Sequence, residues 1–241
     1  NASFQVKFDP GQIPPDEMLA KLKELESSQV ETKSVIDTRI IEVPVYYQDP
    51  WTQETLMKFR DRHQDPNSTD IEYAAEINGF NSVDQFIKAH SGAPWIVTMV
   101  GFVAGLPFLF QLVDRVRQIE VPKYLRPRTD TPKLTVGYGG CFTAIYSVRG
   151  AGGYQMFGIT PMPIYDPKQE ISYLTDFMVF FKPGDIVQFR SIGREEYEST
   201  VAAVEDGMFS PRIRNIEFSL DGFNQDIDGY NHRIQEALYG N

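Results

Sequence analysis

The sequence predicts an α+β protein with a small N-terminal α/β domain, a β-barrel or β-sandwich, and a C-terminal helix. Up to about residue 92, strand-like and helix-like segments alternate. From Trp95 onward, short runs of Val, Ile, Phe and Tyr are separated by Gly and Pro turn signals. A last apolar stripe has the spacing of a helix. We therefore divide the chain into domains at residues 1–92 and 93–200, followed by a strand–helix extension at 201–241.

Each element expected in the first 92 residues has a local signal. Alternating polar and apolar residues indicate a strand, whereas a proline pair, a capping box or a glycine indicates a helix end. The elements are a strand at Ser3–Phe8, a helix opened by Pro14-Pro15, a strand at Arg39–Tyr47, a helix at Asp70–Asn78 ended by Gly79, and a helix from the capping box Ser82–Gln85 to near His90 and Gly92.

Beyond Trp95 the expected elements are mostly strands. They are Trp95–Phe102, Leu134–Tyr138, Thr143–Tyr146, Gly153–Gly158, Phe177–Phe181, Ile186–Phe189 and Ile213–Phe218. Between two of them, Lys182-Pro-Gly-Asp185 suits a type II turn, because proline presets the second position and glycine accepts the positive φ of the third. The final helix carries one apolar stripe, formed by Phe223, Ile227, Tyr230, Ile234 and Leu238.

The composition disfavours some classes of partner. The 241 residues include 23 Lys and Arg against 33 Asp and Glu, a net charge of −10, so we expect no binding to nucleic acid or anionic membranes. The longest apolar stretch, Trp95–Leu112, is broken by Gly101, Gly105 and Pro107 and is unsuited to a membrane span. A single cysteine, Cys141, excludes an internal disulfide and fits a reducing compartment. We therefore expect a cytoplasmic protein.

The glycine-rich stretch Val136–Gln155 is the most unusual part of the chain. It contains neither the Gly-x-x-x-x-Gly-Lys-Ser/Thr pattern of a P-loop nor the Gly-x-Gly-x-x-Gly pattern of a dinucleotide fold. Its glycines alternate with residues that favour strands, which indicates ordered β structure. Gly150–Gly153 could present backbone N–H groups to an anion or could form a plain barrel turn, and both interpretations stay open.

The remaining reactive side chains give no complete motif. His90, at a helix end, is a candidate acid–base group or a structural residue. His63 and His232 lie in polar surroundings and are expected to be solvated, and Cys141 is expected to be a buried structural thiol. No His, Cys and carboxylate spacing indicates a zinc site, so no metal is expected. These patterns alone leave the function open.

A set of short motifs between about residues 36 and 195 carries the functional interpretation. They are His90-Ser91, Gly101-Phe102, Gly105–Phe108, Lys123–Thr129, Thr131-Pro132, Val136–Gly140, Ile145-Tyr146, Gly152–Gln155 and Pro183–Asp185. In this order they resemble the carboxyltransferase C–D domain family, which includes subunit 1 of allophanate hydrolase, the B-type subunit of 5-oxoprolinase and the Kip-type kinase inhibitors. They are most similar to the C–D region of urea carboxylase, as is the tail from Gly207 to Leu238.

The resemblance implies a cyclophilin-like barrel from about residue 93, preceded by a smaller α/β domain that lacks part of its N-terminal unit. The glycines would shape one wall of a cleft that a partner subunit completes. Three positions depart from the family pattern. Ala104 and Ala151 stand where the family usually has proline, and Ile159 stands where arginine is common. The last departure leaves the substrate open, because arginine would suit a carboxylate or phosphate.

The resemblance also implies a function. The chain would be one subunit of an ATP-dependent amidohydrolase or a biotin-dependent carboxyltransferase acting on a urea-, allophanate- or 5-oxoproline-like substrate, and it would be inactive alone. The alternative is a regulatory protein that inhibits a sensor histidine kinase. The implied catalytic residue is His90, and the implied substrate-binding residues are Lys123, Arg128, Tyr146, Gly152, Gly153 and Gln155.

The same resemblance implies a heteromer. The expected partner is a second carboxyltransferase-like subunit, of the type of allophanate hydrolase subunit 2 or the C-type subunit of 5-oxoprolinase. Docking is expected through the apolar segment Gly101–Phe110. The helix with Phe223, Tyr230 and Leu238 is either a second docking stripe or packs on the chain's own barrel, and both interpretations stay open. No biotinylation motif surrounds Lys58, and no nucleotide-binding loop is recognisable. ATP, and biotin if the reaction uses it, would therefore be bound mainly by partner polypeptides.

Overall fold

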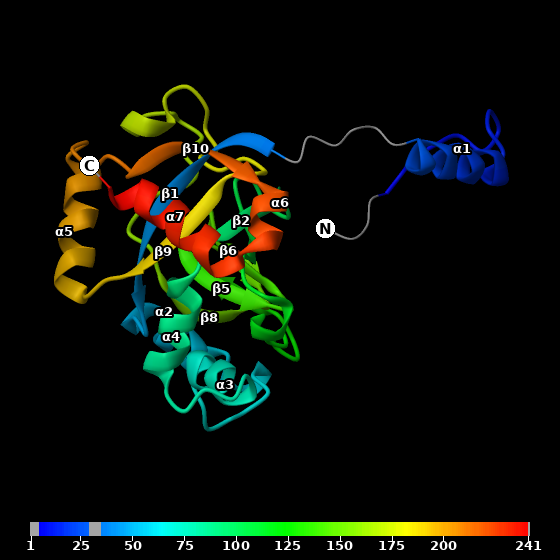
Figure 1. Cartoon of the computed structure of the whole chain (residues 1–241). Coiled ribbons are helices and arrows are strands. Elements are labelled where there is room, and N and C mark those ends of the chain that lie inside the picture. The colour runs from blue at the N-terminus through cyan, green and yellow to red at the C-terminus, as the bar shows by residue number, and fades with distance from the viewer. Residues whose placement is uncertain (1–4, 29–34, 241) are drawn as a thin grey trace.

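A closed ring of strands forms the centre of the molecule (Figure 1). The computed structural model describes residues 5–28 and 35–240. The main sheet has eight strands in the order β10-β1-β8-β5-β6-β3-β2-β9, and β1 also pairs with β9, which closes the ring and leaves β10 outside it. All of its pairs are antiparallel except β1 with β9. The predicted mixture of helices with a large sheet is confirmed.

The strands of the main sheet have the following bounds: β1 Val35–Tyr47, β2 Trp95–Val100, β3 Pro107–Gln111, β5 Thr135–Gly139, β6 Phe142–Ile145, β8 Gln155–Ile159, β9 Ile186–Ser191 and β10 Ile213–Ser219. A separate two-stranded sheet consists of β4 (Arg128–Thr131) and β7 (Gly150–Gly152). The α-helices are α1 Pro15–Ser27, α2 Pro50–Lys58, α3 Asp70–Ile77, α4 Val83–Gly92, α5 Arg194–Glu205, α6 Leu220–Gln225 and α7 Ile227–Tyr239.

Strand β1 joins the two ends of the chain. It pairs with β8, β9 and β10, so the ring uses residues from both sides of residue 92. Its central residues are buried without alternation, because both faces are covered. Ile41 and Val43 point into the interior of the ring, whereas Ile40 packs in a second cluster with residues of the C-terminal helices.

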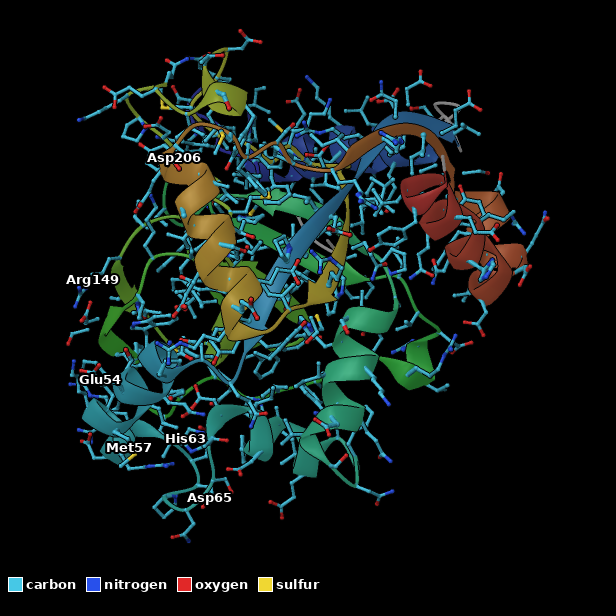
Figure 2. The ribbon with its side chains drawn as sticks, turned by 90° about the vertical axis from the view of Figure 1, so that its left-hand side faces the viewer. Glu54, Met57, His63, Asp65, Arg149 and Asp206 are labelled. Atoms are coloured by element: carbon cyan, nitrogen blue, oxygen red, sulfur yellow. The ribbon has the colours of Figure 1, made fainter. Side chains whose placement is uncertain are left out.

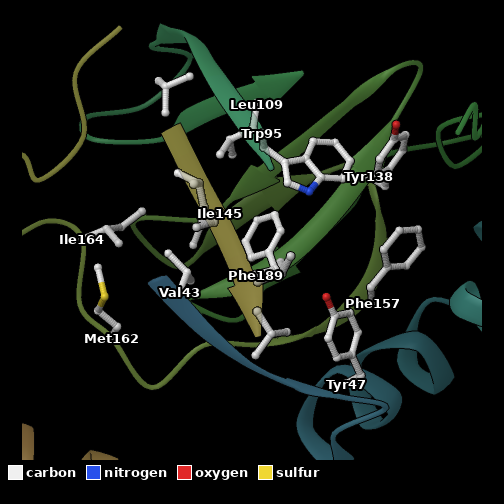
Figure 3. Close-up of a cluster of buried hydrophobic side chains, with 14 of the residues drawn as sticks. Val43, Tyr47, Trp95, Leu109, Tyr138, Ile145, Phe157, Met162, Ile164 and Phe189 are labelled. Atoms are coloured by element: carbon white, nitrogen blue, oxygen red, sulfur yellow. The ribbon is translucent and has the colours of Figure 1, made fainter. Parts of the chain in front are cut away.

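Large aromatic and aliphatic side chains fill the interior of the ring (Figure 3). Trp95 packs edge to face against both Tyr138 and Phe189, with the ring centroids 5.9 Å apart in each pair. Phe157 stacks on Tyr138 at 5.7 Å. This interior is a packed core, because each of these four residues is at most 1% exposed.

Helices α3 and α4 begin and end close to where the sequence predicts. Thr69 and Glu72 form a capping box at the start of α3, and Gly79 follows the helix with φ of +73°. Ser82 caps α4 by accepting a hydrogen bond from the backbone N–H of Gln85. Helices α2 and α3 pack on β8, and α4 packs on β9.

The C-terminal apolar stripe forms two helices instead of one. Asp226 interrupts the pattern and caps α7 by accepting from the N–H of Gly229 at 3.0 Å. Phe223, Tyr230 and Leu238 are at least 91% buried against residues of β1, β9 and β10. Of the two alternatives for this stripe, packing on the chain's own sheet is therefore the correct one, because residues of these strands cover it.

Other expectations differ in detail. Ser3 and Phe4 of the expected Ser3–Phe8 strand lie outside the described residues, and Gln5–Phe8 form no strand. Phe177–Phe181 contains only an isolated bridge between Tyr165 and Val179. Strands β3, β4 and β7 and helix α5 were not predicted. The expected type II turn is confirmed, because Asp185 N–H donates to the Lys182 carbonyl and Gly184 has φ of +93°.

Helix α1 forms as expected, but it has no buried residue and stands apart from the ring in Figure 1.

Candidate functional site

A pocket of about 440 Å³ lies on the face of β3 and β6 that points away from the core. Successive residues of a strand face opposite sides, so Leu109 and Thr143 point inward while Phe108 and Ala144 point to the pocket. The lining residues are Phe102, Leu106, Phe108, Lys123, Tyr124, Pro127, Ala144, Tyr146, Ala151, Gly152, Gly153 and Tyr154. Four of the predicted substrate-binding residues are among them: Lys123, Tyr146, Gly152 and Gly153.

The glycines of the Val136–Gln155 stretch make room for tyrosine rings. A Cβ at Gly139 would lie 2.5 Å from the ring of Tyr154, and a Cβ at Gly152 would lie 2.3 Å from the hydroxyl oxygen of Tyr146. Neither distance is tolerable for a real side chain. The glycines therefore allow the two rings to lie close to the backbone and to form the wall of the pocket.

Lys123 is the one charged side chain among the lining residues that the structure describes. Its Nζ lies 5.2 Å from the centroid of the Tyr154 ring, close enough for a cation–π contact. The other polar groups of the lining are the hydroxyls of its tyrosines. The pocket thus combines aromatic walls with one cation and a few hydrogen-bond donors, which is typical of small-molecule sites.

Arg128 does not line the pocket. It is fully buried behind the wall, where its Nε donates to Thr131 Oγ1 at 3.3 Å and its guanidinium lies 4.3 Å from the centroid of the Tyr124 ring. Within residues 5–28 and 35–240, neither Nη atom makes a hydrogen bond of ordinary geometry. The predicted direct contact of Arg128 with substrate therefore has no path in this structure.

A buried carboxylate lies on the other side of Tyr124. Asp70 accepts from the Tyr124 hydroxyl and from the backbone N–H of Met156, each at 2.6 Å. Burial raises the pKa of Asp70, while these hydrogen bonds and the Arg128 cation oppose the rise. The sequence indicated Asp70 only as the first residue of a helix, because its contact with Tyr124 spans 54 positions.

His63 belongs to the same buried group. It was expected to be solvated, but it is only 4% exposed, and its Nε2 lies 3.5 Å from Asp70 Oδ1. Its ring packs edge-on against Tyr73 and Tyr124. Figure 2 shows His63 next to α2, on which Glu54 and Met57 are labelled. The expectation failed because the tyrosines that cover His63 are distant in sequence.

His90 lies in the core, away from the pocket. It is fully buried, and its ring nitrogens lie 2.8 Å from the Tyr47 hydroxyl and 2.8 Å from Thr143 Oγ1. Burial lowers the pKa of His90 to about 3, so the imidazole is neutral at physiological pH. Thr143 and Ala144 point to opposite faces of β6, so this strand separates His90 from the pocket.

Gln155 and Cys141 also lie outside the pocket lining. Gln155 is fully buried, and its amide nitrogen donates to Gln64 Oε1 at 3.1 Å and to the Pro122 carbonyl at 3.0 Å. It thereby holds the segment that leads into Lys123. Cys141 is a half-buried free thiol instead of the fully buried one that was expected.

Two features are absent from the described parts of the chain, residues 5–28 and 35–240. No cluster of three or more His, Cys, Asp or Glu side chains is arranged to hold a metal ion there. None of the helices in these segments has the length and apolar character needed to cross a bilayer.

Comparison with known families places the pocket in context. The family model for the "Carboxyltransferase domain, subdomain C and D" matches residues 2–175, which is more than half of the chain. The chain belongs to this family. The match covers β1 to β8 and every residue that lines the pocket, so the pocket is part of the carboxyltransferase domain.

Curated relatives of this carboxyltransferase-domain chain have two kinds of name. The B-type subunit of 5-oxoprolinase from Bacillus subtilis is 29% identical over 68% of the chain and 58% of its own length. A putative urea carboxylase of Emericella nidulans is 23% identical over 92% of the chain and 18% of its own length. The chain thus spans about three fifths of the first relative and under a fifth of the second.

A solved structure supports the fold. The urea amidolyase of K. lactis superposes with a TM-score of 0.75 over 95% of this chain and 14% of its own, at 24% identity. The mixed sheet with its flanking helices is therefore the fold of the corresponding part of that enzyme. At this identity the likeness extends to the fold alone.

Proposed function

We propose that the chain supplies one wall of a substrate site in a multi-subunit enzyme of the 5-oxoprolinase or urea carboxylase type. The substrate would be a urea-, allophanate- or 5-oxoproline-like compound. The observation that carries this proposal is the convergence of Lys123, Tyr146, Gly152 and Gly153 on one pocket. These residues come from three separate motifs, and the family match covers all of them. The names of the curated relatives supply the substrate class.

The pocket chemistry fits a small carbonyl compound. Amides and ureas present carbonyl oxygens that accept hydrogen bonds, and the Lys123 ammonium and the Tyr146 hydroxyl can donate them. The aromatic rings of Phe108, Tyr124 and Tyr154 enclose the rest of the ligand. Once the proposed partner closes the site and excludes water, each hydrogen bond to a charged donor is strengthened.

The pocket needs a partner to perform chemistry. Among its described lining residues there is no His, Ser, Cys, Asp or Glu, so they contain no nucleophile and base pair. We assign those groups to a second carboxyltransferase-like polypeptide that closes the cleft. Phe102 at the mouth is 72% exposed and Met99 is 41% exposed, which gives this partner an apolar rim to cover.

The residues of the pocket are not arranged to bind the phosphates of a nucleoside triphosphate. Gly150 and Gly152 are paired with Thr131 and Arg128 in the β4–β7 sheet, so their backbone forms a strand in place of a phosphate cradle. Lys123 is the single cation of the described lining. ATP chemistry, and biotin chemistry if the reaction is a carboxylation, therefore belongs in this proposal to partner polypeptides. The proposed complex is cytoplasmic.

The test is to assemble the complex and change the pocket. The chain is co-expressed with the carboxyltransferase-like subunit encoded by a neighbouring gene. Turnover of 5-oxoproline, allophanate and urea is then measured with ATP present. Lys123→Met should lower kcat/KM by about 10-fold or more, as expected for a lost charged hydrogen bond. Lys168→Met, at an exposed position outside the pocket, is the matched control. Equal activity of both variants would remove the pocket from the mechanism.

A further inference from the structure

Arg128 is unusual because it is fully buried and forms no salt bridge with any residue that the structure describes. A guanidinium stays protonated in proteins, and burying one without hydrogen bonds is costly. Only its Nε has a partner of ordinary geometry, Thr131, while both Nη atoms are buried without one. The position therefore calls for an explanation beyond packing.

The strand pairing directs Arg128 toward Tyr146. Arg128 and Gly152 are direct partners in the antiparallel β4–β7 pair, so their side-chain positions lie on the same face of the sheet. On that face the absent Cβ of Gly152 would meet the Tyr146 hydroxyl at 2.3 Å. The Arg128 guanidinium and the Tyr146 hydroxyl thus lie on the same face of this sheet, beside the space that the missing Gly152 side chain leaves.

Two donors act on the Tyr146 hydroxyl from the protein side, although no hydrogen bond of ordinary geometry joins an Arg128 Nη atom to it. The Arg128 side chain and the backbone N–H of Tyr154 both act on this hydroxyl and lower its pKa, while burial, the larger effect, raises it and keeps the phenol protonated. When donors occupy the lone pairs of a hydroxyl, its own proton is left for an acceptor elsewhere. The remaining side of Tyr146 is the pocket that it lines.

We propose that Arg128 is a positioning residue that directs the Tyr146 hydroxyl proton into the pocket, where it is donated to the carbonyl oxygen of the ligand. The identity of the ligand in this inference rests on the proposed function, whereas the arrangement of Arg128 and Tyr146 does not depend on it. Arg128 touches no substrate and acts only through Tyr146. This arrangement explains why an arginine is buried beside a pocket whose described lining it does not join.

Asp70 and Tyr124 balance the buried charge. The Tyr124 hydroxyl donates to the Asp70 carboxylate, and the face of the same ring carries the Arg128 guanidinium at 4.3 Å. A cation and an anion are thereby held on either side of one tyrosine, without direct contact. This leaves the Nη donors of Arg128 available to Tyr146, which a direct salt bridge would consume.

The first test reads Tyr146 itself in the isolated chain. Tyrosine labelled with ¹³C at Cζ is followed by NMR at neutral pH, with Tyr146→Phe used to assign the signal. Arg128→Met should shift the Tyr146 Cζ signal and leave that of Tyr138 in place, because the Tyr138 hydroxyl donates to the Ile119 carbonyl at 2.7 Å, away from Arg128. An unchanged Tyr146 signal in the folded variant overturns the proposal.

Arg128→Lys keeps the test decisive if Arg128→Met does not fold. Lysine retains the charge but loses the planar fork of donors, so the Tyr146 signal should still shift, by a smaller amount. A folded Arg128→Lys chain with a wild-type Tyr146 signal overturns the proposal in the same way.

The second test uses the assembled complex with 5-oxoproline or urea as the probe. If Arg128 acts through Tyr146, Arg128→Met should lower kcat/KM by about 10-fold alone and by less than about 2-fold in the Tyr146→Phe background. Independent, multiplying effects would overturn the proposal. A complex that turns over neither probe would contradict the proposed function, whereas the NMR result would still decide the role of Arg128.

Discussion

The Tyr146 hydroxyl lies so close to Gly152 that residue 152 has no room for a side chain. An added Cβ would lie 2.3 Å from the hydroxyl oxygen. The glycine lies in β7 and the tyrosine directly follows β6, so two separate motifs meet at one point of the pocket wall. The close approach accounts for a glycine in a strand, where it is normally unfavourable.

Gly152→Ala should therefore disturb Tyr146 and the pocket together. We expect a loss of about 1–3 kcal/mol in the free energy of unfolding, as for other overpacked sites, and weaker ligand binding by the assembled complex. Urea unfolding and ligand titration measure the two effects. Gly150→Ala is the control, since no atom beyond its chain neighbours lies within 4 Å of its added Cβ and Gly150 does not line the pocket. Equal effects of the two substitutions would contradict the role of the close contact.

The charges of Asp70 and Arg128 should be coupled. Asp70→Asn leaves the buried guanidinium without a nearby anion, and we expect the free energy of unfolding to fall by about 3 kcal/mol or more. In an Arg128→Met background the same change should cost clearly less, which a double-mutant cycle in urea measures. Asp130→Asn, at the exposed pair with Arg149, should cost under about 1 kcal/mol. Additive effects of Asp70 and Arg128 would show that the two charges do not interact.

The buried imidazole of His90 should make stability depend on pH. The pKa of His90 is about 3 in the folded chain and close to 6.5 when unfolded, so between these values the unfolded state binds more protons. His90 thus contributes stability that is present above pH 6.5 and is lost as pH falls toward 3. The expected loss from this group is about 2 kcal/mol between pH 6.5 and 5.

His90→Gln should flatten this part of the stability–pH curve, measured by urea unfolding at each pH. His232→Gln, with a side chain 72% exposed, should keep the wild-type slope. A His90→Gln curve parallel to that of the wild type would show that His90 is not the group responsible.

Local signals predicted much of the fold. Gly79 and Ser82 gave correct helix ends because a helix end is decided by the residues next to it. Strand β3 was not recognised, since its phenylalanines were interpreted as a docking surface although Phe108 and Phe110 also pack against Phe142. Helix α5 was missed because none of its residues is buried, which leaves a weak apolar pattern.

The site was predictable where motifs contribute directly to the pocket. Lys123, Tyr146 and the glycines were found through the family motifs, whereas the burial of Arg128 depends on the pairing of β4 with β7. The contact of Asp70 with Tyr124 spans 54 positions, and no local pattern reports such a distance. The environment of the histidines was the hardest feature to predict from the sequence. His90 lies in the core, whereas His232 lies on the surface.

The exposed rim of the pocket should be covered by the partner. Phe102 is 72% exposed and has φ of +69°, a conformation that is unfavourable for a large residue outside a functional context. Phe102→Asp should weaken the complex by about 10-fold or more while the circular dichroism spectrum of the chain is unchanged. Phe177→Asp, at a 64% exposed position outside the pocket, is the control. If size-exclusion chromatography shows both variants in the complex to the same extent, the rim is not the interface.

The central claim is that the pocket is one half of a shared active site. The most direct measurement is ATP-dependent turnover of 5-oxoproline, allophanate and urea by this chain alone, by the carboxyltransferase-like partner alone, and by the two together. We predict turnover of one of these substrates by the pair only, reduced at least about 10-fold by Lys123→Met or Tyr146→Phe. Full turnover by this chain alone, or a pair whose activity is unaffected by both substitutions, would contradict the account.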